Sequence, residues 1–258
     1  MKKNTIILYA GKKFGCLALN YMAKFYPPDY VVPNLDDNGK DSIIHDSIIK
    51  LAKKLNIKII NNKKLKKLQT TQKLEIDYIF CAGSTIIIPK DVLKSCKYGA
   101  INFHPSLLPK YRGRYSNVHA LFNGEEYTGV TCHWIGTGID KGNIISQKKI
   151  KIKKFDTAKD LYEKFTSEAF KLFKISYHKI LDQKKIKSKK IIEKIKYEKK
   201  HLPNRGKIDW KWNGKKILNF IKSMTYEPFE PPSFYLGKKK YFIIEHNLIK
   251  KKFYKSPK

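Results

Sequence analysis

The chain has no long apolar run and no closely spaced pair of cysteines, and it contains few arginines for a protein of such high positive charge. No stretch approaches the ~20 consecutive apolar residues of a membrane-spanning helix, so the sequence predicts no membrane association. The apolar run Ile6–Ala10 is short and is followed by Lys12 and Lys13, which indicates a buried first strand of a cytoplasmic protein rather than a signal peptide. The four cysteines are scattered, with no C-x-x-C pair, so we expect reduced core thiols and no metal site.

The scarcity of arginine helps to interpret the high net positive charge of the chain. The formal net charge is +33, yet only three of the 55 basic residues are arginines. A charge of this size suggests nucleic acid, but lysine is spread over most of the chain, and arginine is the usual reader of phosphates and base edges. We therefore interpret the charge as lysine-rich composition on a solvated surface. By contrast, Arg112, Arg114 and Arg205 mark positions where a planar, two-pronged donor is preferred to a point charge.

Short apolar runs alternate with helical patterns in the N-terminal part of the chain. Strands are predicted at Thr5–Tyr9, Tyr30–Val32, Lys58–Ile60, Asp77–Cys81 and Ala100–Phe103, with helices at Phe14–Phe25 and Ser42–Leu55. This β-α-β-α-β order predicts a Rossmann-like α/β fold, an open and largely parallel sheet with helices on both faces. Ligands of such sheets bind beyond the carboxyl ends of the strands, where Asn102 and His104 fall.

The later part of the chain predicts two more strands, a long helix and a small C-terminal subdomain. The strands are Gly129–Trp134 and Asn143–Ile152, and a capping signature at Thr157 begins the helix. The lysine-dense stretch 183–200 is predicted to be a connector. A helix at Gly214–Ser223 and a hairpin that turns at Leu236–Lys238 then predict a helix-plus-hairpin subdomain at 201–258, after a main domain at 1–182.

Asn102, His104 and Asp140 form a candidate catalytic set. Residues two apart on a strand point to the same side, so Asn102 and His104 face the same space. An imidazole acts as acid or base near neutral pH, and an amide is a neutral donor to an oxyanion. Asp140 lies in a loop with Gly136 and Gly138 that can bring its carboxylate to the imidazole. No Ser or Cys nucleophile accompanies them, so the set suits an acyl transfer in which the substrate supplies the nucleophile.

Three longer motifs carry a resemblance to a known family. They are GAINFHPSLLPKYRGR from Gly99 to Arg114, GEEYTGVT from Gly124 to Thr131 and GIDKGNIISQ from Gly138 to Gln147. In this order and spacing they resemble the 10-formyltetrahydrofolate-dependent formyltransferases, whose motifs read approximately N-x-H-x-S-L-L-P-x-x-R-G, T-G-V-T and L-D-T-G-D. The resemblance covers about residues 4–151. The chain departs from the last motif at Ile139, Lys141 and Asn143, but Asp140 is retained.

The resemblance implies a role for each site residue. Asn102 would stabilise the oxyanion formed from the formyl group of 10-formyltetrahydrofolate, His104 would move protons between the acceptor amine and the folate nitrogen, and Asp140 would assist His104. The folate ring would lie between two loops. The residues implied to bind it are Ile86, Ile87 and Ile88 after the strand Asp77–Cys81, the loop residues Gly136, Thr137, Gly138 and Ile139, and Arg114. The resemblance also implies a cis bond at Leu108-Pro109.

The acceptor amine separates three branches of the family. Methionyl-tRNA formyltransferases carry a complete C-terminal barrel, for which residues 201–258 are too few. Glycinamide ribonucleotide formyltransferases begin with a Gly/Ser/Asn-rich phosphate loop that AGKKFG does not match. Nucleotide-sugar N-formyltransferases share the SLLPKYRGR string and an IDW helix with a Pro/aromatic hairpin, here from Ile208 onward. We therefore expect transfer to a dTDP- or UDP-linked amino sugar, with the other two acceptors as alternatives.

Substrate contacts and assembly follow from the same resemblance. Arg114 would lie where the two substrates meet, with Tyr115, Ser116 and Asn117 beside the acceptor, while Arg112 would brace the loop. Tyr226 would stack on a base or join a dimer hairpin, although core packing is an equally simple role. The C-terminal hairpin would hold a homodimer, and residues 1–182 would be the formyltransferase catalytic domain. A catalytically silent RNA-binding protein is disfavoured, because RNA binding needs no set such as Asn102, His104 and Asp140.

Overall fold

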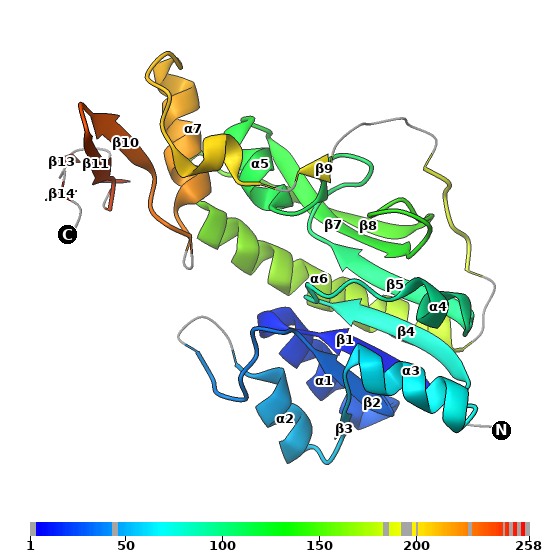
Figure 1. The fold of residues 1–258 in the computed structure, drawn as a ribbon. Coiled ribbons are helices and arrows are strands. Elements are labelled where there is room, and N and C mark those ends of the chain that lie inside the picture. Colours follow the sequence, from blue (N-terminus) through cyan, green and yellow to red (C-terminus); the bar gives the residue numbers. More distant parts are fainter. Residues whose placement is uncertain are drawn as a thin grey trace. The chain divides into compact units, whose positions relative to one another are not determined.

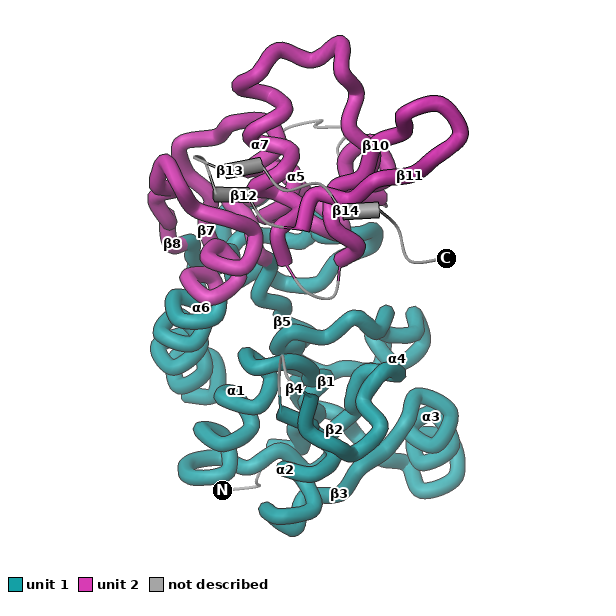
Figure 2. Tube along the Cα trace, turned by 90° about the vertical axis from the view of Figure 1, so that its left-hand side faces the viewer, with its two compact units in different colours: residues 1–104, 131–147, 166–191 teal, residues 105–130, 148–165, 192–258 magenta. Residues whose placement is uncertain are grey.

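The structure is a computed structural model that describes residues 4–42, 46–182, 186–191, 198–199, 201–226, 229–244, 246–247, 250–251 and 254–255. Residue contacts divide the chain into two compact units (Figure 2). Unit 1 comprises residues 1–104, 131–147 and 166–191, and unit 2 comprises residues 105–130, 148–165 and 192–258. The domain limits expected at 182 and 200 stay a prediction, and much of the expected connector lies outside the described residues.

A seven-stranded sheet has the order β3-β2-β1-β4-β5-β7-β8 (Figure 1). Its strands are β1 (Ile6–Ala10), β2 (Tyr30–Pro33), β3 (Lys58–Ile59), β4 (Ile76–Ala82), β5 (Cys96–His104), β7 (Tyr127–Trp134) and β8 (Ile144–Lys151). The first five pair in parallel, and β7 runs antiparallel to β5. The predicted Rossmann-like α/β fold with an open sheet is therefore confirmed.

Helices cover both faces of the parallel strands. They are α1 (Lys12–Phe25), α2 (Ile48–Lys54), α3 (Asn62–Thr71), α4 (Lys90–Lys94) and α6 (Ala158–Leu181). Helices α1 and α6 lie on one face, and α3 and α4 on the other (Figure 1). Because side chains alternate along a strand, each buried strand packs against both layers and reads as one continuous apolar run.

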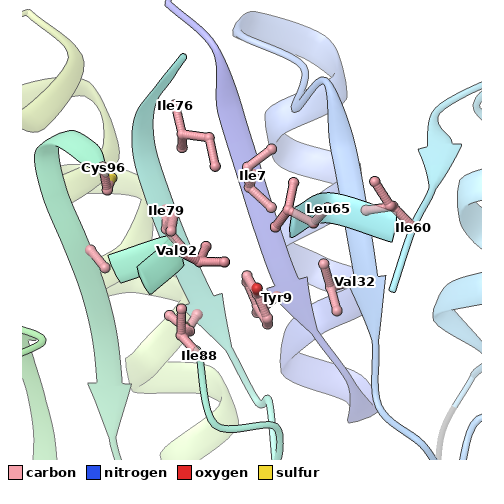
Figure 3. Close-up of a cluster of buried hydrophobic side chains, with 12 residues drawn as sticks. Ile7, Tyr9, Val32, Ile60, Leu65, Ile76, Ile79, Ile88, Val92 and Cys96 are labelled. Carbon is pink, nitrogen blue, oxygen red and sulfur yellow. The ribbon is translucent and has the colours of Figure 1, made fainter. Parts of the chain in front are cut away.

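The two faces of the sheet hold different cores. On the side of α3 and α4, Ile7 and Tyr9 of β1 pack in a cluster with Leu65 and Val92 (Figure 3). The opposite side is aromatic. The ring centroid of Phe80 lies 5.0 Å from that of Tyr177 on α6, and the centroid of Phe103 on β5 lies 5.7 Å from that of Phe14 on α1. The ring of Phe173 lies within 6.2 Å of all four of these rings. This aromatic layer fixes the side of β5 that faces away from Asn102 and His104.

The start of α2 differs from the sequence-based expectation. The predicted helix Ser42–Leu55 begins only at Ile48, and residues 43–45 lie outside the described residues. Ser47 is the N-cap, with a side chain that accepts from the backbone N–H of Lys50. The Asp37 carboxylate accepts from the next two backbone N–H groups, at Ile48 and Ile49. These acceptors satisfy the free N–H groups of the first turn and so set where the helix begins.

Unit 2 contains the predicted helix and hairpin. Its described elements outside the large sheet are β6 (Arg112–Gly113), α5 (Ser116–Phe122), β9 (Glu198–Lys199), the 3₁₀ turn η1 (Pro203–Gly206), α7 (Gly214–Met224), β10 (Ser233–Leu236), β11 (Lys239–Phe242), β12 (His246–Asn247), β13 (Lys250–Lys251) and β14 (Tyr254–Lys255). Asn213 caps α7 by accepting from the N–H of Lys216. The hairpin turns at Gly237, whose φ of 60° suits glycine. The small C-terminal subdomain is thus confirmed.

Asn34 ties the end of β2 to the loop that follows β4. Its side-chain amide donates to the carbonyl of Gly83 at 3.2 Å and accepts from the N–H of Thr85 at 2.8 Å. It is buried, and it lies so close to Gly11 that a Cβ there would come within 1.9 Å of Asn34 Nδ2. Asn34 therefore holds in place the loop that leads to Ile86–Ile88.

No helix among the described residues is long and apolar enough to cross a membrane.

We expect Asn34→Ala to lower the free energy of unfolding by about 1–3 kcal/mol, because it removes two hydrogen bonds, to the Gly83 carbonyl and from the Thr85 N–H, each worth about 0.5–1.5 kcal/mol. Urea denaturation followed by circular dichroism measures the change. Asn38→Ala is the matched control, since Asn38 is exposed and accepts only from the N–H of Lys40. Equal stability of the two variants would contradict the role assigned to Asn34.

Candidate active site

Asn102 and His104 lie at the carboxyl end of β5. His104 is the last residue of the strand and is buried, with 3% of its surface exposed, while Asn102 is partly buried. The parallel register places Asn102 beside Cys81, near the end of β4. Both polar side chains therefore lie at the strand ends where ligands of α/β sheets bind, as the sequence predicts.

His133 of β7 joins this pair, and the sequence analysis missed it. The antiparallel register places Asn102 opposite His133 and His104 opposite Thr131. Directly opposed residues in an antiparallel pair share a face of the sheet, so all four side chains lie on one side. The signal available in the sequence was the alternation of Thr131 and His133 with buried apolar residues in the predicted strand Gly129–Trp134.

Asp140 reaches the same face from the loop between β7 and β8. The loop turns back tightly, because a Cβ at Gly142 would lie 1.6 Å from the carbonyl oxygen of Trp134. Gly138 and Asp140 have positive φ values of 103° and 49°. Aspartate tolerates the left-handed region better than most side chains, and glycine adopts it freely. The glycines of the motif thus shape a turn that carries the carboxylate back to the sheet.

The carboxylate of Asp140 lies between two imidazoles. Its Oδ2 is 3.3 Å from Nδ1 of His104, and its Oδ1 is 3.6 Å from Nε2 of His133. The amide Nδ2 of Asn102 lies 3.3 Å from Nε2 of His133 and 3.5 Å from Oδ1 of Asp140. The structure therefore brings the predicted catalytic residues Asn102, His104 and Asp140 together, with His133 as a fourth member.

Burial keeps His133 neutral. Only 1% of its surface is exposed, and burial lowers the pKa of its imidazole from 6.5 to about 4. The negative charge of Asp140 opposes this shift, and His104 adds to it. Nδ1 of His133 lies 2.8 Å from the carbonyl oxygen of Trp134.

The two loops expected to hold the folate ring also belong to unit 1. The first follows β4 and carries Ile86, Ile87 and Ile88; Ile88 is buried, whereas Ile87 is 80% exposed. The second carries Gly136, Thr137, Gly138 and Ile139, and Ile139 is 43% exposed. Exposed isoleucines fit a planar, partly apolar molecule better than they fit water. The role of these residues in binding folate stays a prediction.

The residues predicted to contact the substrate lie in unit 2. Arg114 is exposed, and Tyr115 precedes α5 with a φ of 60°. Ser116 is buried beside the carbonyl of Gly113, and Asn117 accepts from the Thr128 hydroxyl at 3.4 Å. Tyr226 packs against Phe229 and Tyr162, with ring centroids 5.2 Å apart in each pair, in a cluster that also includes Tyr115. Burial raises the pKa of Tyr226. Tyr226 thus packs in the core of unit 2, and its contact with substrate stays a prediction.

The formyl transferase family matches residues 11–174 of this sequence. The chain belongs to this family. The match contains Asn102, His104, His133 and Asp140, and the predicted Leu108-Pro109 cis bond is present.

The relatives of this chain include a bifunctional polymyxin resistance protein and a methionyl-tRNA formyltransferase. It is 34% identical to the bifunctional polymyxin resistance protein ArnA of Wigglesworthia glossinidia brevipalpis over 98% of its length, and 31% identical to methionyl-tRNA formyltransferase of Caldanaerobacter subterraneus over 69%. It spans only 39% and 59% of the lengths of these two relatives.

Two solved structures show the same fold. The sugar 3N-formyltransferase WlaRD, solved with dTDP and 5-N-formyl-THF, has a TM-score of 0.76 at 26% identity, over 93% of this chain and 85% of that one. The N-formyltransferase of Helicobacter canadensis, solved with folinic acid and dTDP-3-aminofucose, has a TM-score of 0.76 at 27% identity, over 92% and 86%.

Within the part of the chain that the structure describes, no three His, Cys, Asp or Glu side chains are arranged to hold a metal ion. The four cysteines are buried, and burial raises the pKa values of their thiols to about 12 for Cys16, Cys81 and Cys132 and about 11 for Cys96. Such thiols are poor nucleophiles near neutral pH.

The buried neutral His133 predicts a loss of stability in acid. Its pKa is lower in the folded protein than in the unfolded chain, so unfolding takes up a proton as the pH falls from about 6.5 towards 4. The stabilisation is complete above pH 6.5 and declines below it. We expect His133→Gln, which cannot titrate, to lose less free energy of unfolding than the parent between pH 7 and pH 4.5. Urea denaturation at several pH values measures this, and parallel pH profiles would show that the prediction is wrong.

Proposed function

We propose that this protein transfers a formyl group from 10-formyltetrahydrofolate to the amine of a nucleotide-linked amino sugar. The observation that carries the proposal is the convergence of Asn102, His104 and Asp140 at the end of β5 in a chain of the formyl transferase family. These three side chains supply an oxyanion donor, a proton carrier and a carboxylate that favours the charged imidazole.

The chemistry follows from where these groups lie. 10-Formyltetrahydrofolate supplies the formyl group: a bond forms between the acceptor nitrogen and the formyl carbon, and the bond from that carbon to N10 breaks. The amine loses a proton and N10 gains one. His104 is placed to carry that proton, and its Nδ1 faces Asp140 at 3.3 Å, so the carboxylate stabilises the imidazolium while the proton is held. An N–H of Asn102 donates to the oxygen on which negative charge develops.

Two observations support an amino-sugar acceptor. The similar WlaRD and Helicobacter canadensis structures contain dTDP or dTDP-3-aminofucose, and each aligns with more than nine-tenths of this chain. The SLLPKYRGR string and the C-terminal helix and hairpin are the features that the sequence shares with that branch. The 30% identity with methionyl-tRNA formyltransferase of Listeria monocytogenes over 86% of the chain supports methionyl-tRNA as the second candidate.

Direct assay of acceptors tests the proposal. The protein is incubated with 10-formyltetrahydrofolate and, separately, dTDP-amino sugars, UDP-amino sugars, glycinamide ribonucleotide and methionyl-tRNA. Mass spectrometry then identifies the acceptor that gains a formyl group. We expect a nucleotide sugar with a free amine to be formylated. Formylation of methionyl-tRNA alone would assign the second function instead.

We further propose that the β10–β11 hairpin joins two copies in a homodimer. Tyr235 and Leu236 of the hairpin are 48% and 60% exposed, and Trp210 nearby in unit 2 is 56% exposed. Exposed apolar side chains gathered on one element are typical of an interface. Sedimentation of the parent and of Leu236→Lys distinguishes a dimer through this hairpin from a monomer.

We expect His104→Asn to lower kcat by about 10²–10⁴-fold, the usual contribution of a positioned acid or base. Steady-state kinetics with the acceptor found above measures the change, and thermal melting confirms that the variant is folded. His178→Asn is the control, because His178 lies on α6 and contacts the hydroxyl of Tyr21 instead of the site. A His104 variant with parental kcat would remove this residue from the mechanism.

Arg114→Lys keeps the charge and removes the planar fork. If Arg114 binds carboxylate or phosphate oxygens with two parallel hydrogen bonds, kcat/KM should fall by the equivalent of roughly 1–3 kcal/mol. Arg114 is exposed, so the melting temperature should not change. The reverse exchange at a solvated position, Lys63→Arg on α3, is the control. Parental kinetics for both substrates would mean that the guanidinium of Arg114 has no special role.

A further inference from the structure

We infer that His133 is a positioning residue for Asn102, an inference that rests on the proposed function. The Nε2 lone pair of His133 holds one N–H of the Asn102 amide. The other N–H, which points to Asp140, is thereby kept as the donor for the formyl oxygen of the substrate. His133 itself touches no reacting atom in this scheme and acts through Asn102.

The tautomer of His133 follows from its neighbour. Nδ1 lies 2.8 Å from the carbonyl oxygen of Trp134, and a carbonyl oxygen only accepts, so Nδ1 carries the proton. In a neutral ring Nε2 is then a bare acceptor. Its contact with Asn102 Nδ2 at 3.3 Å is therefore an N–H···N hydrogen bond donated by the amide.

The neutral state of His133 follows from its surroundings. The ring is almost completely buried, on a strand in the interior of the sheet, and burial disfavours the imidazolium. The titratable groups that face it are Asp140, at 3.6 Å, and His104, with ring centroids 6.5 Å apart. Proton uptake by His104 during the reaction adds a positive charge nearby, which further disfavours a second imidazolium.

The orientation of the Asn102 amide is then determined. In the reverse orientation its carbonyl oxygen would face two acceptors, Nε2 of His133 and Oδ1 of Asp140, with no hydrogen between them. In the observed orientation both N–H groups are donated, one to each. The contact with Asp140 is the longer at 3.5 Å, near the limit for a hydrogen bond, so that N–H is the one a substrate oxygen can take over.

A pair of amide variants separates this role from simple packing. His133→Gln can still accept from Asn102 through its side-chain oxygen at the position of Nε2. His133→Asn can donate to the Trp134 carbonyl from the position of Nδ1 but is too short to reach Asn102. We expect His133→Asn to lower kcat about 10–100-fold with the KM for 10-formyltetrahydrofolate within about 3-fold of the parent, and His133→Gln to stay within about 5-fold in kcat.

A double-mutant cycle tests the dependence on Asn102. In an Asn102→Ala background, His133→Asn should change kcat by less than about 3-fold, because the group that it positions is gone. Multiplicative losses in the cycle, or equal kcat for the Gln and Asn variants of His133, would overturn the inference. Thermal melting of each variant accompanies the kinetics, and a variant that does not fold is replaced by His133→Leu.

A measurement without an acceptor keeps this inference separate from the proposed function. Long-range ¹H–¹⁵N spectra of the labelled parent report which ring nitrogen of His133 carries the proton, with His133→Gln used to assign its signals. We expect protonation at Nδ1 alone at pH 7. A proton on Nε2 would overturn the inference even if an amino sugar is formylated. Failure of every acceptor together with the Nδ1 tautomer would overturn the proposed function and the kinetic role built on it, and leave only the hydrogen bond.

Discussion

The geometry of the site depends on the antiparallel pairing of β5 with β7. One register places Asn102 opposite His133 and His104 opposite Thr131. A slip of one residue would turn His133 to the other face of the sheet. Alternate residues prevent that slip, because Phe103 and Cys132 are buried on the opposite face. The aromatic layer around Phe173 therefore contributes to the alignment of polar groups that it does not touch.

If both buried imidazoles beside Asp140 were protonated, one carboxylate would face two positive charges, and burying the excess charge would cost free energy. The structure resolves this by making the two rings unequal. Burial keeps His133 neutral, and its Nδ1 donates to the Trp134 carbonyl, which leaves Nε2 as an acceptor. His104 faces the same carboxylate through Nδ1, at 3.3 Å. In the function that we propose, Asp140 supports the proton carried by His104, while the neutral His133 accepts from the amide of Asn102.

The sequence predicts features that depend on residues close together in the chain. It does not predict features that depend on contacts between distant residues. Asn102 and His104 are separated by one residue in a string that resembles a known family, and Asp140 lies in a glycine-rich string of the same kind. His133 was missed because its meaning depends on which strand lies beside it. Helix α3 was missed although Asn61 provides a local cap by accepting from the N–H of Lys64. The start of α2 could not be found from adjacent residues alone, because Asp37 accepts from two N–H groups of its first turn that lie 11 and 12 residues later in the chain.

Two of the few arginines, Arg112 and Arg114, lie in different environments. Arg112 is only 5% exposed, on β6, and a delocalised guanidinium with five donors is easier to bury than a compact, strongly hydrated ammonium. Arg114 is exposed, so burial does not explain why arginine stands at this position.

The abundant lysines make a different kind of contact. Lys149 lies 3.5 Å from the ring centre of Tyr127, and Lys216 covers Trp212 at 5.1 Å. In both pairs the ammonium nitrogen lies over the face of the aromatic ring, a cation–π contact. Lysines of this kind therefore contribute to the packing of aromatic side chains in the fold.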